Sequence, residues 1–350
     1  MYSYNAPIFS PPVFFNRKDL KRAAKEDMRT AHPRVWKVTL VYLLLTSGLF
    51  LLLNLLLGSS VPYTRDLLTI LFTTDDPQVL LNALSTPSSP AALPVFFLQV
   101  LLQLYAAVME FGYYGYTLRR SRGEDASYGD LLGGFGMAGR VIVMNLIVLA
   151  FSLCWAFLVL VPVTLAISFL LTMFLMGSYL YTASAEQLVG QLLVLYPVII
   201  VLFIAAALLI LFLTLRYAFV PFCLADRPDD GPLEAVRRSR RLLSGRYGEI
   251  LKLVLSFLGW NILSAVLSGL VSGVCVGVGC VLFLGSGSMT ALTVGIVAGE
   301  VLSFVLPLPF TVWLTGYYTS TLARYYCAVS DAAPQPDDGQ QMPGNSGLPF

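Results

Sequence analysis

The Lys and Arg residues of this 350-residue chain are distributed very unevenly among its apolar stretches. All but one of the 22 basic residues lie before the first long apolar stretch, after the second, between the fourth and the fifth, or after the sixth. The exception is Arg65. Because basic residues near membrane spans are retained in the cytoplasm, this distribution predicts six transmembrane helices with both termini on the cytoplasmic side.

Composition supports a membrane protein. The chain is 57% hydrophobic and 12% charged, whereas soluble domains are about half apolar and about a quarter charged. A helix crosses the bilayer core with about 20 apolar residues. We expect spans at 36–57, 93–118, 141–176, 191–220, 250–284 and 290–323. The prediction is an all-α polytopic membrane protein with one membrane domain over 16–328, an irregular segment 1–15 and a disordered cytoplasmic tail 329–350.

Short amphipathic helices are expected on the cytoplasmic face. The segment 17–30, RKDLKRAAKEDMRT, carries one narrow apolar stripe of Leu20, Ala24 and Met28, which suits a helix on the membrane surface or against its own bundle. A further short helix is expected in the link between spans two and three. In the link after span four, Asp229 or Asp230 is the expected cap, Pro232 the first turn and Gly245 the stop.

The N-terminal segment and the outer loops allow further predictions. The N-terminal segment lacks a basic region before an apolar core and a small-residue cleavage site, so we expect the first span to be retained. The first outer loop, 58–92, is the longest. The segment SAEQLVGQ is expected to form the second outer loop because it contains no basic residue.

Similar strings recur at equal spacing. HPR at 32–34, AGR at 138–140 and SGR at 244–246 each precede a span, and the interval from Arg34 to Arg140 equals that from Arg140 to Arg246. Each following pair of spans closes with TLRR, TLRY or TLARYY. Fixed periods indicate repeated units, here 16–120, 123–220 and 229–328, which must be parallel because each has two spans. The alternative is chance, since Gly-Arg is also a natural boundary before a span.

The segment 216–260 resembles a known family. RYAFVPFCLADRPDDGPLEAVRRSRRLLSGRYGEILKLVLSFLGW contains a Tyr-containing span end, an Ala-Asp-x-Pro turn, a Glu-Ala-x-x-x-Ser-Arg helix and a Phe-x-Gly-Trp span. The opening NRKDLKRAAKEDMRTAHPRVW and the closing GYYTSTLARYY extend the similarity. In these features the chain resembles domain of unknown function 975. The resemblance implies a multi-pass protein of the bacterial cytoplasmic membrane and brings no established activity or catalytic residues.

The residues that most enzymes need are scarce. The single His, His32, precedes a proline, which leaves neither a Ser-His-Asp arrangement nor a His-rich metal site. No phosphate-binding glycine loop follows a strand, and the five cysteines show no CxxC spacing. The basic segments lack the aromatic-basic motifs of nucleic-acid binders. We therefore expect no enzyme activity, no cofactor, no metal and no nucleic-acid partner.

Two of the charged residues within the apolar spans are candidates for a functional pair. Glu110 lies in AAVMEFGYYGY and Arg216 at the inner part of span four. Ionisable residues inside a membrane are costly and are therefore candidates for function. The repeat alignment places the two at similar depth, where they could form an intramembrane ion pair. The competing interpretations are a pair that only fixes helix packing, or an Arg216 side chain that reaches the interface.

Two other groups of side chains have simpler interpretations. Arg237, Arg238, Arg240 and Arg241 are ordinary topology determinants, or contacts for anionic lipid or a cytoplasmic partner. The tyrosines at the inner span ends are expected to be interfacial anchors, with a ligand-lining role as the alternative. They are Tyr113, Tyr114, Tyr116, Tyr317, Tyr318, Tyr325 and Tyr326.

Three classes of function remain. The first is a non-enzymatic membrane scaffold or accessory component that contacts the bilayer, anionic lipids or a protein partner. The second is a transporter or lipid-handling channel with Glu110 and Arg216 in a cavity between repeats. The third, a membrane enzyme, has no recognisable nucleophile, metal set or acid–base pair. The sequence favours the first.

Overall fold

The computed structural model describes residues 17–30, 33–57, 68–70, 92–180 and 185–332. The predicted irregular segment 1–15, most of the first outer loop and the tail from 333 onward lie outside these residues. Among these residues, every regular element is helical. The first half of the chain forms α1 (Arg17–Thr30), α2 (Val35–Leu43), η1 (Leu44–Gly48), α3 (Leu49–Leu57), α6 (Ala92–Ser121), η2 (Tyr128–Met137) and α7 (Ala138–Leu180). The second half forms α8 (Ala185–Thr214), η3 (Leu215–Tyr217), α9 (Val220–Asp226), α10 (Pro232–Leu243), α11 (Tyr247–Ser286), α12 (Met289–Val305) and α13 (Leu308–Asp331).

Several of these helices are long and apolar enough to cross a membrane. Five segments qualify, and they are Val35–Leu57, Pro94–Ser121, Tyr128–Phe174, Leu195–Asp226 and Tyr247–Ser286. A sixth forms if α12 and α13 are taken together across a 42° bend. The bend falls next to Pro307, whose ring clashes with the preceding turn and which donates no backbone hydrogen bond. The all-helical polytopic architecture is confirmed, with the last predicted span broken in two.

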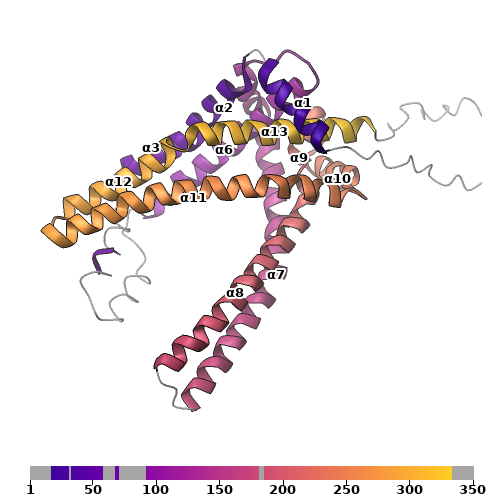
Figure 1. Ribbon diagram of the computed structural model, residues 1–350. Coiled ribbons are helices and arrows are strands. Elements are labelled where there is room, and N and C mark those ends of the chain that lie inside the picture. Colours follow the sequence, from indigo (N-terminus) through magenta and orange to yellow (C-terminus); the bar gives the residue numbers. More distant parts are fainter. Residues whose placement is uncertain (1–16, 31–32, 58–67, 71–91, 181–184, 333–350) are drawn as a thin grey trace, which may run out of the picture.

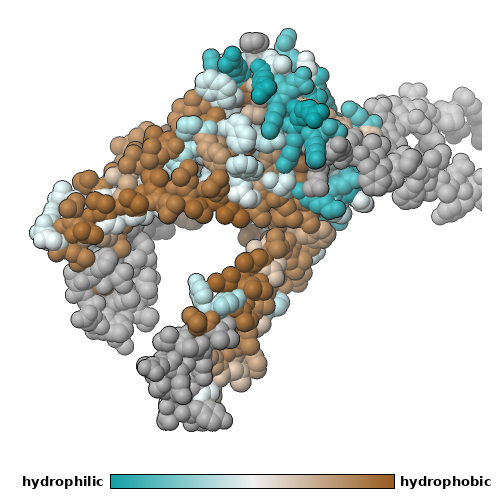
Figure 2. Space-filling model, in the orientation of Figure 1, coloured by the Kyte–Doolittle hydropathy of each residue, from teal (hydrophilic) through white to brown (hydrophobic). Residues whose placement is uncertain are grey.

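The molecule has a polar end and two apolar arms. The hairpin α7–α8 and the hairpin α11–α12 diverge from a common end where α1, α9 and α10 lie (Figure 1). Hydrophilic residues gather over that common end, and the described parts of the arms are mostly hydrophobic (Figure 2). Leu165 on α7, Val201 on α8 and Leu270 on α11 are each more than 60% exposed. Apolar side chains exposed over such lengths are suited to lipid rather than to water.

The arm formed by α11 and α12 is held by small residues. A Cβ atom added to Gly295 would lie 2.8 Å from the carbonyl oxygen of Cys275, and one added to Gly279 would lie 3.0 Å from the Cα atom of Gly295. Because lipid offers no hydrophobic force between spans, helices in membranes associate where small residues let their backbones approach closely. The glycine-rich sequence of α11 therefore serves this contact on the face that meets α12.

The packed core lies at the polar end. The stripe of α1 predicted from the sequence faces inward, with Ala24 fully buried and Leu20 and Met28 packed beside it. The helix α1 lies along α13, which brings the first and last described helices together (Figure 1). Gly316 of α13 lets both α1 and α2 approach, since its Cβ position lies 3.6 Å from Met28 Cε of α1 and 3.2 Å from Thr39 Oγ1 of α2. The helix α1 therefore lies against its own bundle.

One predicted helix is confirmed with a different type, and three boundaries differ from the prediction. The link helix between spans two and three is a 3-10 helix, η2, whose first turn has a capping box formed by Ser127 and Asp130. The cap of α10 is Gly231 rather than Asp229 or Asp230, and it makes no side-chain hydrogen bond. The loop predicted at SAEQLVGQ is mostly helical because α8 begins at Ala185. Residues 329–331, predicted as the start of the tail, belong to α13.

The other signals around α10 are confirmed. Pro232 occupies the first turn of the helix, where its missing N–H costs nothing because the first amides of a helix have no partner within it. Gly245 follows the helix with a φ of +79°. This left-handed conformation is open to glycine without strain, so Gly245 lets the chain turn sharply from α10 into α11.

Candidate functional site

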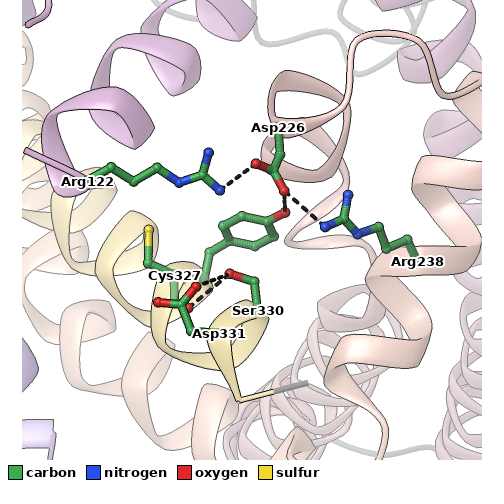
Figure 3. Close-up of polar contacts among 7 residues, drawn as sticks. Arg122, Asp226, Arg238, Cys327, Ser330 and Asp331 are labelled. Carbon is green, nitrogen blue, oxygen red and sulfur yellow. Dashed lines mark hydrogen bonds and ion pairs between the residues drawn. The ribbon is translucent and has the colours of Figure 1, made fainter. Parts of the chain in front are cut away.

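The densest polar cluster of the polar end centres on Asp226, the last residue of α9. Its Oδ2 atom accepts hydrogen bonds from Arg238 Nη2 at 3.0 Å and from the Tyr326 hydroxyl at 2.9 Å. Its Oδ1 atom pairs with Arg122. Arg122 and Arg238 approach the carboxylate from opposite sides (Figure 3). Asp226 thus joins the end of α6 to α9, α10 and α13.

This cluster is largely shielded from water. The Asp226 side chain is 12% exposed, and the Arg238 side chain 19%. Burial lowers the pKa of the Arg122 guanidinium, but its hydrogen bond to Asp226 and the charge of that carboxylate outweigh burial and raise the pKa overall. Arg122 therefore remains a cation at physiological pH. Since all three partners of Asp226 donate to it, the carboxylate is held in place and the cluster acts as a tie between helices.

A second tie joins the two ends of the described chain. The guanidinium of Arg324 on α13 pairs with both carboxylate oxygens of Asp27 on α1. Next to it, the Tyr325 hydroxyl donates a hydrogen bond to Glu249 Oε2 of α11 at 3.1 Å. Two parallel N–H···O bonds fix both the distance and the orientation of such a pair. Arg324, the last basic residue of the chain, therefore holds α13 against α1 at the polar end.

The structure places Glu110 on α6 with an exposed side chain. Its Oε1 atom accepts a hydrogen bond from the Tyr114 hydroxyl at 3.1 Å. Tyr42 of α2 lies near enough to interact electrostatically with Glu110, and its ring stacks on Tyr113 with 4.6 Å between centroids. Glu110 thus borders a group of tyrosines inside the span.

Arg216 lies in η3, directly after α8. Its Cζ atom is 4.9 Å from the centroid of the Trp155 ring, in cation–π contact. No ion pair joins Glu110 and Arg216, which are both described residues. The structure therefore does not bring the two predicted residues together as a pair, and a role of either in function stays a prediction.

The four arginines of α10 separate into two groups. Arg238 turns inward to Asp226, while Arg237, Arg240 and Arg241 are exposed. Arg237 and Arg241 both lie beside Glu234, which is itself 41% exposed. Exposed pairs of this kind contribute about 0–1 kcal/mol. The outward face of α10 is thus a basic surface with one acidic residue.

Most of the tyrosines predicted as interfacial anchors are core residues instead. Tyr113, Tyr116 and Tyr326 are essentially inaccessible. The Tyr113 hydroxyl forms a 2.7 Å hydrogen bond with Thr39 Oγ1 and accepts another from Thr319 at 3.2 Å. The Tyr116 hydroxyl donates to the Pro33 carbonyl. The anchor interpretation was wrong for these residues because partners inside the bundle satisfy their hydroxyls, so the rings can be buried.

The ion pair between Asp226 and Arg122 was not predicted from the sequence. Asp226 appeared only within the Ala-Asp-x-Pro turn of the family resemblance, and Arg122 as one of many basic residues near a span. Neither signal indicates a partner, because Arg122 and Asp226 are far apart in the chain. Among the described residues, no group of three or more His, Cys, Asp and Glu is arranged to hold a metal ion.

Comparison with known proteins gives one result. Residues 15–333 match the family described as "Protein of unknown function (DUF975)". No curated protein and no solved structure matches. The match spans nearly all of the chain, including every helix described above. The chain therefore belongs to the DUF975 family.

Proposed function

We propose that this protein is a non-enzymatic scaffold or accessory component of the bacterial cytoplasmic membrane, which presents the basic face of α10 to anionic lipid headgroups or to an acidic protein partner. The observation that carries the proposal is that the arginines of α10 point in two directions. One arginine, Arg238, is used for packing, and three others point away from the protein.

The inward face of α10 holds the helix in place. Ala235, Val236 and Leu243 are buried in the main core, and the Ser239 hydroxyl donates a 2.9 Å hydrogen bond to the Arg216 carbonyl. A helix fixed on one face offers the side chains of the other at defined positions. Each basic residue close to the surface of an anionic membrane contributes about 1 kcal/mol to binding.

Substitution of Arg240 and Arg241 by Gln tests this surface. The expected result is a loss of co-purifying anionic lipid or of a cross-linked partner, measured by mass spectrometry after extraction with native lipid. The matched control is Arg22→Gln with Arg29→Gln, which removes two exposed charges from α1. Equal loss from both double variants would mean that only total charge matters and would refute a specific α10 surface.

The proposal places the polar end in the cytoplasm. Single cysteines in an otherwise cysteine-free protein can test this at Ser244, which follows α10, and at Ser286, which ends α11, since both are exposed. A membrane-impermeant thiol reagent added outside intact cells should label Ser286→Cys and spare Ser244→Cys. The reverse pattern would overturn the orientation. Ser239 is unsuitable because it is fully buried and unreactive on either side.

We also infer three parallel repeats, 16–120, 123–220 and 229–328. The strings GYYGYTL at 112–118 and GYYTSTL at 316–322 occupy equivalent places near the ends of the first and third units. A Cβ atom on Gly112 would lie 2.1 Å from the Leu131 carbonyl oxygen of η2, and one on Gly316 would lie 3.6 Å from Met28 Cε of α1 and 3.2 Å from Thr39 Oγ1 of α2. Each glycine thus lies against a helix of another unit.

The order of these contacts supports a closed ring. The end of the first unit receives η2 of the second, the end of the second accepts the Ser239 hydrogen bond of α10, and the end of the third binds α1 of the first. In each case the partner is the short helix of the following unit. This cyclic exchange is what parallel repeats about an axis along the membrane normal would produce.

One observation favours a transporter or lipid-handling channel as the second candidate. Glu110 is exposed within a span and lies beside Tyr42 and Tyr114. If this carboxylate serves transport, Glu110→Gln should insert normally and abolish a substrate-dependent growth phenotype. Normal growth would leave the scaffold as the better proposal.

A further inference from the structure

Arg216 lies at the end of a helix that already suffices to cross the bilayer. The helix α8 has 30 residues, whereas about 20 span the hydrocarbon core. Arg216 follows its last residue, Thr214, on the side of the polar end. The guanidinium therefore lies near the depth at which one leaflet carries its headgroups.

This guanidinium lacks an acceptor within the described part of the chain. The Nε atom is fully buried without a hydrogen-bond partner, and no described carboxylate forms an ion pair with Arg216. A buried charged group without a partner is costly in apolar surroundings. Its contact is with the face of Trp155, and stacking of that kind leaves the N–H groups at the guanidinium edge free to donate.

A second donor lies against the same ring. The Trp155 Nε1 atom donates to the Tyr217 hydroxyl at 3.2 Å. Tyr217 is held by stacking on Phe151, with 5.8 Å between ring centroids. Because its oxygen accepts this hydrogen bond, its own proton remains for another acceptor, and no described residue supplies one. Arg216 and Tyr217 together therefore offer donors around Trp155 and no acidic group.

We propose that Arg216 and Tyr217, positioned by Trp155, bind the phosphate group of a phospholipid in the leaflet nearest the polar end. Phosphate supplies the negative charge and several acceptor oxygens, which suit a planar guanidinium that donates two parallel hydrogen bonds. Apolar side chains beside the site, Phe151 and Phe212, are about 40% exposed and available to acyl chains. These neighbours favour a lipid over a soluble phosphate. The site is distinct from the exposed face of α10.

The test measures retained lipid. The full-length protein is placed in nanodiscs of phosphatidylglycerol or of a phosphate-free galactolipid, and the lipid retained after detergent extraction is counted by native mass spectrometry. The wild type should retain phosphatidylglycerol and not galactolipid. Arg216→Gln should weaken that retention about tenfold or more, since a hydrogen bond to a charged group contributes about 1.5–3 kcal/mol. The matched control, Arg227→Gln, removes an exposed charge from the loop after α9 and should change little.

Further variants separate the contributions. Tyr217→Phe keeps the ring that stacks on Phe151 and should weaken retention by a smaller factor than Arg216→Gln. Arg216→Lys keeps the charge and loses the planar fork, so it should fall between the wild type and Arg216→Gln. Inorganic phosphate and glycerol 3-phosphate at millimolar concentration should not displace the lipid. Displacement would mean that the ligand is a soluble phosphate compound.

A measurement on the native site covers the case in which the Arg216 variants do not fold. In a protein whose only tryptophan is Trp155, phospholipids with a nitroxide on the headgroup should quench its fluorescence more strongly than lipids labelled at the end of an acyl chain. Stronger quenching by the acyl-chain label would overturn the proposal. Equal retention of the two lipids by the wild type, or undiminished retention by Arg216→Gln, would also overturn it.

Discussion

Asp226→Asn is the substitution whose effect the structure defines most sharply. It keeps the shape of the side chain and removes its charge, so Arg122 and Arg238 would face each other without the carboxylate between them. Removing one partner of a fully buried ion pair costs about 3–5 kcal/mol. Here Asp226 is 12% exposed, and the Arg122 side chain 35%. Solvent screening at that level reduces the expected loss of stability to about 2–3 kcal/mol.

The same chain contains a matched control. Asp130 pairs with Arg119 at 2.7 Å, but the Arg119 side chain is 56% exposed. The other oxygen of Asp130 accepts a hydrogen bond from the Ser127 amide at 2.7 Å, which an Asn side chain could also accept. Asp130→Asn should therefore cost about 0–1 kcal/mol, because exposed ion pairs contribute little.

Thermal unfolding in detergent can compare the two variants. Cys223 is fully buried, so in a protein with no other cysteine a thiol-reactive dye reports opening of the core around α9. Because unfolding of this kind is often irreversible, all samples must be heated at one scan rate. For a chain of 350 residues, a difference of 2 kcal/mol corresponds to about 3 °C in the midpoint. Midpoints for Asp226→Asn and Asp130→Asn within about 1 °C of each other would refute the assignment of Asp226 as the tie.

Two further substitutions test the packing of the polar end. Gly112→Ala should lower the midpoint in the same assay because its Cβ atom would lie 2.1 Å from the Leu131 carbonyl oxygen. Gly115→Ala, which meets open space, should be neutral or stabilise the helix by up to about 1 kcal/mol, and equal effects would contradict the close approach of η2 to α6. Arg324→Gln should loosen α1 from α13 and make α1 more susceptible to proteolysis. Unchanged proteolysis of α1 would mean that the ion pair with Asp27 does not hold this helix.

Local patterns predicted much of the fold. The stripe of Leu20, Ala24 and Met28 gave the buried face of α1 because a helix repeats every 3.6 residues. Pro232 and Gly245 marked the limits of α10 because each restricts or releases the backbone by itself. The break at Pro307 was missed because the flanking residues are uniformly apolar, and hydropathy alone does not show where such a segment bends.

The candidate sites were harder to predict because they are formed by residues that are far apart in the chain. Glu110 and Arg216 were predicted to pair because they lie at similar depth along two spans, yet similar depth along two helices does not determine which way the side chains point. The four arginines of α10 look alike in the sequence, and only the position of Asp226 distinguishes Arg238 from its neighbours. Tyrosines near span ends could serve as anchors or as core residues, and the partners of Tyr113 come from α2 and α13.

The sequence by itself determined the class of protein. Charge distribution and long apolar segments follow from the cost of moving charge and unpaired backbone groups into lipid, and each residue contributes to that cost independently of the rest of the fold. The tertiary structure alone decided which charges meet and which do not. Asp226 is a tie, Arg216 lies against Trp155 and Arg324 closes the polar end because helices distant in the chain pack side by side there. Pairing of this kind depends on relative helix positions and rotations, which the pattern of a single segment does not contain.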